Sequence, residues 1–176
     1  MSCSGAQAIA ENVAAFQEGW PGPWTEDELF GAHYPEAVGE AFARFCRAEL
    51  GSPVAAGLFY EASIGCVAGV ELEDGRRVVV KAHPAASPRE FLEAVVRIQT
   101  ELVRRGFPAP AVLLGPRPLG RTHATVERLV DEGEYRDAHE PPVRAALAWA
   151  LARLVALTSD LSPRGLERQT LQPGVL

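Results

Sequence analysis

The chain has 176 residues, of which 47% are hydrophobic and 23% charged, and its formal net charge is -6. This length supports one hydrophobic core with helical additions rather than two complete domains. The acidic balance provides no basic surface for nucleic acid or an anionic bilayer, so neither partner is expected.

The N-terminal sequence and the cysteines indicate the compartment. The first residues, MSCSGAQAIAENVAAF, have no basic start and no apolar stretch of signal-peptide length. No segment supplies the ~20 apolar residues that a membrane-spanning helix needs. Cys3, Cys46 and Cys66 show neither CxxC spacing nor Cys/His ligand spacing. We therefore predict a cytoplasmic protein with reduced thiols and no metal site.

Residues 6–50 show helical patterning that is broken by the stretch GWPGPW. Thr25 and Glu28 have the spacing of a capping box at a helix start. A later helix is expected to end near Gly51. Three large apolar residues recur on one face of that helix: Val38, Phe42 and Phe45.

The period changes in residues 57–83, where valine-rich runs flank Glu73-Asp74-Gly75. The Asp-Gly pair is a hairpin signal, so two antiparallel strands are predicted here. A helix follows, with Ser87 predicted as its N-cap and Gly106 as its stop. Its apolar stripe consists of Phe91, Val95, Ile98 and Leu102.

The segments FPAPAVLL, GPRPLG and THATVERLV predict a strand, a turn and a second strand. After two prolines, residues 142–158 repeat leucines at helical spacing, which predicts a long amphipathic helix. An exposed apolar face on this helix would favour self-association or a partner chain.

Ser63, Gly65, Ala68 and Val70 occupy the positions of a G-x-G-x-x-G-x-V pattern, with small residues in place of two glycines. A hairpin that passes close over a triphosphate must have small residues at its tip, where backbone N–H groups can meet phosphate oxygens. The alternative is a tight hairpin with no ligand.

Lys81 lies in the strand sequence VVVKA, on the same face as Val79 by period-2 alternation. An ammonium group on a mostly apolar strand needs an anionic partner, unless its stem runs along an edge to solvent. The glycines join two antiparallel strands, whereas Rossmann and P-loop glycines join a strand to a helix, so those classes are excluded.

The hairpin, the strand lysine, the helix ending in RRGFPAP and the strand ATVERLVDEGEYRD together resemble one family. They are similar, over residues 57 to about 160, to the N-terminal lobe of the protein-kinase-like fold in aminoglycoside phosphotransferases and choline-kinase-like small-molecule kinases. The resemblance implies an α+β fold with a five-stranded antiparallel sheet and one packed helix. The expected divisions are an N-terminal helical extension (1–52), an ATP-binding lobe (53–138) and a helix with a tail (139–176).

The resemblance also implies an ATP site. The loop around Gly65 would cover the phosphates, and Lys81 would hold the α and β phosphates. Val126 would be the gatekeeper, and the backbone of Glu127 and Leu129 would form two hydrogen bonds with adenine.

Kinase-like lobes pair this lysine with a helix glutamate. Here Gln99 is the polar residue well inside the apolar stripe and is our preferred partner for Lys81. Glu93, which lies about 150° from the stripe centre, is the alternative. A Gln99 satisfied by the backbone remains equally open.

The sequence contains no H-G-D-x(4)-N loop, and none of its four histidines has an aspartate two residues on. We expect no catalytic and no metal-binding residue in this chain, with Mg²⁺ held only by a second, helical lobe that would begin at residues 142–158. The predicted function is the ATP-binding part of a phosphotransferase that moves the γ-phosphate to a hydroxyl of a small molecule. The acceptor is left open, and the alternative is a non-catalytic kinase-like scaffold or interaction module.

Overall fold

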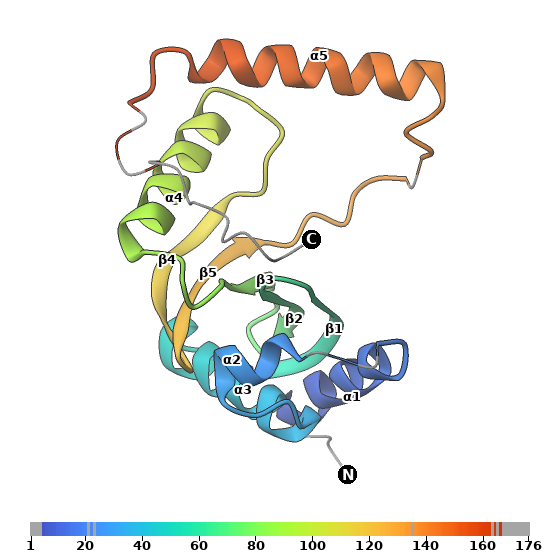
Figure 1. Ribbon diagram of the computed structural model, residues 1–176, viewed down its shortest axis with the longest axis vertical. Coiled ribbons are helices and arrows are strands. Elements are labelled where there is room, and N and C mark those ends of the chain that lie inside the picture. Colours follow the sequence, from blue (N-terminus) through green and yellow to red (C-terminus); the bar gives the residue numbers. More distant parts are fainter. Residues whose placement is uncertain are drawn as a thin grey trace.

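The computed structural model describes residues 5–20, 22, 24–134, 136–162, 164 and 166. They form an α+β fold in which one five-stranded antiparallel sheet carries helices on both faces (Figure 1). The predicted fold class and strand number are therefore confirmed. Cys3 and most of the tail predicted after residue 162 lie outside the described residues.

The sheet has the strand order β1-β2-β3-β5-β4. Every neighbouring pair is antiparallel. Helix α4 (Arg89–Arg104) lies between β3 and β4 in the chain. The strand bounds are β1 Val54–Ala62, β2 Cys66–Leu72, β3 Arg77–Ala82, β4 Val112–Leu119 and β5 Thr122–Arg128.

Three N-terminal helices cover one face of the sheet: α1 (Gly5–Glu18), α2 (Thr25–Phe30) and α3 (Pro35–Leu50). The predicted apolar face of α3 is confirmed, because Val38, Phe42 and Phe45 are all buried there. They belong to a core that also includes one side of β2, β3 and β5. Alternate residues of these strands thus point toward the N-terminal helices and away from α4.

The capping box predicted at Thr25 is wrong. Helix α2 begins at Thr25, and no side chain caps it. The Thr25 hydroxyl instead donates to the Ser63 carbonyl of the β1–β2 hairpin. Helix α4 begins at Arg89, and Pro88 rather than the predicted Ser87 occupies its N-cap position. A capping sequence competes with tertiary partners, and at Thr25 the hairpin is the partner.

The β2–β3 hairpin occurs where the Asp-Gly signal predicts it, but its loop contains three residues, 73–75. The Leu72 N–H donates to the Arg76 carbonyl (2.8 Å), so these two residues close the loop. Gly75 has φ +83°, a conformation that glycine adopts without strain. This loop length pairs Lys81 with Val67 rather than with Ala68.

The segment GPRPLG is strand up to Leu119, and only its last residue, Gly120, lies in a turn. Pro118 pairs with His123, whereas the ladder is irregular between Leu114 and Arg117, where Pro116 lies. Strand β4 is at the edge of the sheet. An edge strand with a bulge tolerates residues that lack an N–H donor, which explains why two prolines do not end it.

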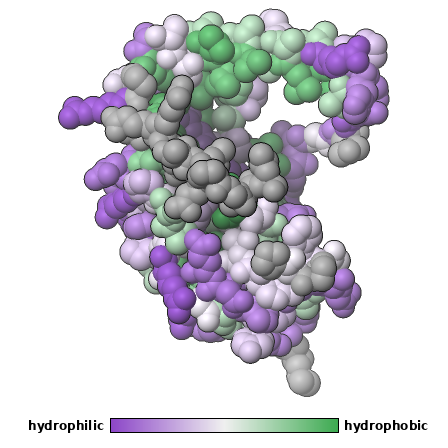
Figure 2. All heavy atoms as spheres, in the orientation of Figure 1, coloured by the Kyte–Doolittle hydropathy of each residue, from purple (hydrophilic) through white to green (hydrophobic). Residues whose placement is uncertain are grey.

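Helix α5 (Pro141–Thr158) forms where a long helix is predicted, but it is not amphipathic. None of its residues is buried, and Arg144 and Arg153 are its only charged residues. Figure 2 shows apolar side chains along this helix and an opening between it and the body of the protein. Four large side chains are more than half exposed: Leu147 (55%), Trp149 (65%), Leu151 (61%) and Val155 (60%).

Cys46 and Cys66 are unpaired and buried, as predicted for reduced thiols. Burial raises the pKa of each thiol to about 12, so both stay protonated at neutral pH. No helix within the described ranges is long and apolar enough to cross a bilayer.

The close crossing of α1 and α3 at Gly39 gives a stability prediction. A Cβ atom there would lie 2.4 Å from the Ala6 carbonyl oxygen. We expect Gly39→Ala to lower the free energy of unfolding by about 1–3 kcal/mol, because the backbones must move apart. Gly115→Ala is the matched control, since a Cβ there meets no atom within 4 Å. Chemical denaturation measures both, and equal stability of the two variants would contradict this packing.

Candidate functional site

The centre of the candidate site is an ion pair between two neighbouring strands. Lys81 on β3 donates from Nζ to Oε2 of Glu127 on β5 at 2.7 Å. The Glu127 side chain is 6% exposed and the Lys81 side chain 37% exposed. The lysine thus has the anionic partner that the sequence demands, and that partner belongs to the protein itself.

Lys81 is the only lysine in the sequence, and the other 16 of its 17 basic residues are arginines. Arginine pairs with surface carboxylates elsewhere in this chain. Lysine differs from arginine because it presents a compact point charge with three donors. This use of a single lysine is a sequence signal that marks the site independently of any motif.

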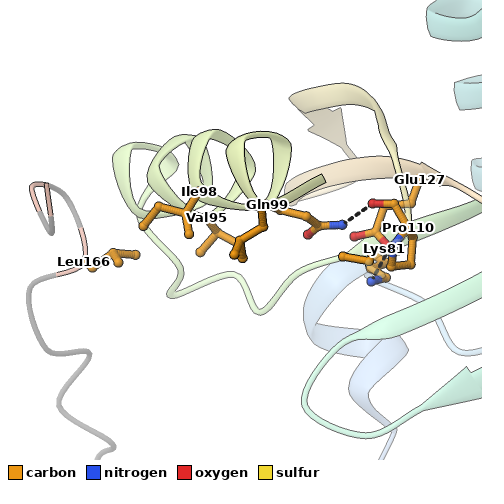
Figure 3. A pocket seen from close by; sticks show the side chains of 9 residues that line it. Lys81, Val95, Ile98, Gln99, Pro110, Glu127 and Leu166 are labelled. Atoms are coloured by element: carbon orange, nitrogen blue, oxygen red, sulfur yellow. Dashed lines mark hydrogen bonds and ion pairs between the residues drawn. The ribbon is translucent and has the colours of Figure 1, made fainter. Parts of the chain in front are cut away.

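A cavity of about 360 Å³ lies beside the ion pair (Figure 3). Lys81 and Glu127 line its sheet side, and Ala109, Pro110 and Leu166 contribute further walls. From α4 it is lined by four residues, none of them charged: Val95, Ile98, Gln99 and Leu102. Three of the four residues of the apolar stripe predicted for α4, all except Phe91, therefore face the same space as the lysine.

Neither of the two helix residues considered as partners for Lys81 forms that contact. Gln99 points into the cavity, but its amide donates to the Pro110 carbonyl at 2.9 Å (Figure 3). Glu93 is exposed on α4 and pairs with Arg89 at 2.8 Å. Gln99 is thus satisfied by the backbone, and Glu127 takes the place predicted for a helix side chain.

The tip of the β1–β2 hairpin lies over the end of β3. A Cβ on Gly65 would lie 2.5 Å from the carbonyl oxygen of Ala82, the residue after Lys81. The Ser63 N–H donates to the Gly65 carbonyl at 2.9 Å, and the Ser63 carbonyl accepts from Thr25. The small residues predicted at this tip therefore allow it to approach the lysine strand closely.

Three other predicted site residues face the opposite side of the sheet. Ala68, Val70 and Val126 are each 0% exposed and belong to the core under the N-terminal helices. Directly paired residues share a face of the sheet, and Lys81 pairs with Val67 and with Thr125. The three predicted residues are each one position from a residue on that face, so their side chains point to the other side. Val67, Gly69 and Thr125 share the lysine face and were not predicted as site residues. Glu127 shares it too, but only its backbone was predicted to take part.

The backbone after β5 is already hydrogen-bonded. The Leu129 N–H donates to the Arg77 carbonyl at 3.0 Å, and the Arg128 N–H donates to the Ala111 carbonyl at 2.9 Å. A contact between the Leu129 N–H and a ligand therefore requires that this group leave Arg77. The predicted hydrogen bond from Leu129 to adenine can therefore form only after the Leu129 N–H breaks its bond with the Arg77 carbonyl.

Two histidines extend the polar group along the same face. His83 Nε2 lies 2.9 Å from the Thr125 hydroxyl oxygen. Burial, and next the Lys81 ammonium, lower the pKa of His83 below its ordinary value of 6.5. Glu127 acts in the opposite direction and His123 in the same direction as Lys81. His83 is therefore neutral at neutral pH and leaves Lys81 as the cation here.

No cluster of three or more histidine, cysteine, aspartate or glutamate residues that could hold a metal ion occurs in the part of the chain that the structure describes. What the site does offer is a half-exposed ammonium, a buried carboxylate, one engaged amide and an apolar cavity. Such a combination suits binding of an anionic group attached to an apolar or aromatic body.

No family model and no curated protein matches the chain. One solved structure, named "putative fructosamine-3-kinase" and from Thermobifida fusca YX-ER1, matches with a TM-score of 0.38 and 24% identity. The match covers 53% of this chain and 32% of that one, so it spans about a third of the length of that protein. The function is therefore inferred from the geometry of the site.

The ion pair makes a prediction about stability. Lys81→Met leaves the buried Glu127 carboxylate without its cation, so we expect a loss of about 1–3 kcal/mol in the free energy of unfolding. The double variant Lys81→Met/Glu127→Gln removes both charges and should recover to within about 1 kcal/mol of the wild type. Arg89→Met, which breaks an exposed pair, should change stability by at most about 0.5 kcal/mol. Chemical denaturation tests the set, and a double variant no more stable than Lys81→Met would contradict the ion-pair account.

The lowered pKa of His83 predicts how stability changes with pH. The unfolded chain takes up a proton at this residue near pH 6.5, whereas folded His83 stays neutral to a lower pH. The contribution of this group to stability is complete well above pH 6.5. It is lost as the pH falls from there through the lower pKa of folded His83. Between about pH 7.5 and about pH 5.5, the wild type should lose more stability than His83→Gln. His139→Gln, at a side chain 94% exposed, is the control. Equal pH slopes for all three proteins would show that His83 is not buried in this way.

Proposed function

We propose that this chain binds ATP through Lys81 and serves as the nucleotide-binding part of a phosphotransferase that transfers the γ-phosphate to a hydroxyl of a small molecule. The observation that carries the proposal is the position of the single lysine. Its ammonium lies at the edge of an apolar cavity, on the strand whose end lies against the tip of the small-residue hairpin. In this proposal the chain holds the nucleotide, and none of its residues activates the acceptor.

The charge state of Lys81 fits a phosphate ligand. An ammonium has three N–H donors, and Glu127 accepts one of them. The side chain is 37% exposed, so its remaining donors can reach a ligand. Hydrogen bonds between an ammonium and phosphate oxygens are about twice as strong as those between neutral groups.

The apolar residues of the cavity supply the second part of the argument. Val95, Ile98 and Leu102 present hydrocarbon surface next to the charged pair. A nucleotide has the matching division between an aromatic base and an anionic tail. The base would lie toward the end of β5, where Glu127 and Leu129 remain the predicted backbone contacts. Ser63 and Gly65 at the hairpin tip would lie over the phosphates.

One observation favours the alternative of a non-catalytic scaffold. Because Glu127 neutralises Lys81, the lysine needs no bound anion to be stable where it is. A lysine kept only as part of a structural ion pair would look the same. The two functions differ in whether ATP binds.

Calorimetric titration with ATP separates the two functions. We expect weak binding by the wild type, with a Kd of about 0.1–1 mM. The double variant Lys81→Met/Glu127→Gln should bind at least about tenfold more weakly, because it lacks the ammonium. Arg89→Met, which lies away from the cavity, should bind like the wild type. A wild type with no ATP-dependent heat would support the scaffold and refute nucleotide binding.

A further inference from the structure

The source of the carboxylate at Lys81 is unexpected. Glu127 belongs to β5, a strand paired directly with the lysine strand, where Val79 is opposite Glu127 and Lys81 is opposite Thr125. The two side chains are thus diagonal neighbours on one face of the sheet. Their separation is set by the strand ladder and not by the packing of a helix against it.

Two acidic residues of helix α4, Glu93 and Glu101, are engaged elsewhere. Glu93 pairs with Arg89, and Glu101 pairs with Arg104 and Arg105. The α4 side chains that line the cavity are uncharged, and Gln99 among them donates to Pro110. Within the described part of the cavity wall, Glu127 is therefore the one carboxylate beside the lysine.

We propose that Glu127 is the positioning residue for Lys81, and that it holds the ammonium ready for a phosphate independently of the placement of α4. The inference rests on the proposed function, in that it takes the ligand of Lys81 to be a phosphate. Its consequence is regulatory. A shift of α4 away from the sheet would change the cavity but would leave the lysine aligned.

The physical reason is the ordering of a flexible side chain. A lysine has four rotatable side-chain bonds, and fixing them costs conformational entropy. If the ligand must fix them, this cost lowers the binding affinity. A buried carboxylate 2.7 Å from Nζ fixes them during folding instead. Without Glu127, the ammonium has to be ordered by the ligand itself, so phosphate affinity should fall even though a negative charge has been removed.

The first experiment uses the fact that the chain has one lysine. The amines that an acylating reagent can modify are those of Lys81 and the N-terminus, and peptide mass spectrometry separates the two products. In Glu127→Gln the amine loses its ionic partner, so we expect acylation of Lys81 to become at least about fivefold faster. The N-terminal amine is the internal reference for reagent activity.

Glu101→Gln is the matched control for the acylation experiment. It removes the α4 acid that pairs with Arg104 and Arg105, but it leaves Glu127 in place. We expect the Lys81 acylation rate in this variant to equal that of the wild type. Circular dichroism and denaturation midpoints confirm that each variant is folded. An unchanged rate in Glu127→Gln, or a rate raised as much in Glu101→Gln, would overturn the inference.

The second experiment separates positioning from direct charge effects on the ligand. Titrations with ATP and with adenosine are compared for the wild type, Glu127→Gln and Lys81→Met/Glu127→Gln. We expect Glu127→Gln to lose about five- to tenfold in ATP affinity, with adenosine affinity nearly unchanged. The double variant should bind ATP no better than Glu127→Gln.

Two outcomes have distinct meanings. Tighter ATP binding by Glu127→Gln would show that Glu127 only repels phosphate, and would overturn the positioning role. A wild type that binds no ATP would overturn the proposed function and with it the phosphate role of Lys81. The acylation rates would still decide whether Glu127 holds the lysine.

Discussion

The ion pair between Lys81 and Glu127 is the interaction on which the candidate site depends. A carboxylate that is 6% exposed is stable only with a cation beside it, and the single lysine of the chain supplies that cation. The pair fixes the lysine at the edge of the cavity. Lys81 and Glu127, on the paired strands β3 and β5, are the charged residues in the described part of the cavity wall. Any ligand of Lys81 meets an ammonium that is already oriented.

The sheet uses its two faces for different purposes. One face packs Ala68, Val70 and Val126 against the N-terminal helices, so the core does not involve the ion pair. The other face carries Lys81, Glu127 and Thr125 toward α4 and the cavity. Substitutions that change the charge of the site therefore leave the larger apolar core intact, which makes the site accessible to mutagenesis.

The fold could be predicted from the sequence because it depends on strong local signals: the apolar faces of α3 and α4 and the Asp-Gly hairpin. The site could be predicted only in part. An Asp-Gly pair fits a two-residue loop, which would place Ala68 and Val70 on the lysine face, whereas the three-residue loop 73–75 turns both to the core. No local pattern distinguishes the two loop lengths, and a shift of one residue in the strand register moves every side chain of the strand to the other face of the sheet. Glu127 was predicted only for its backbone contact with adenine. The role of its side chain could not be predicted, because its partner Lys81 is brought beside it only by the pairing of β3 with β5.

The central claim is that Lys81 receives a nucleotide phosphate at this cavity. The most direct measurement uses an ATP analogue with an amine-reactive acyl phosphate, followed by mass spectrometry of the labelled peptides. The account predicts label on Lys81 that ATP prevents at lower concentrations than adenosine does, while label on the N-terminal amine is unaffected by either. Label on Lys81 that ATP fails to prevent, or label confined to the N-terminal amine, would contradict it.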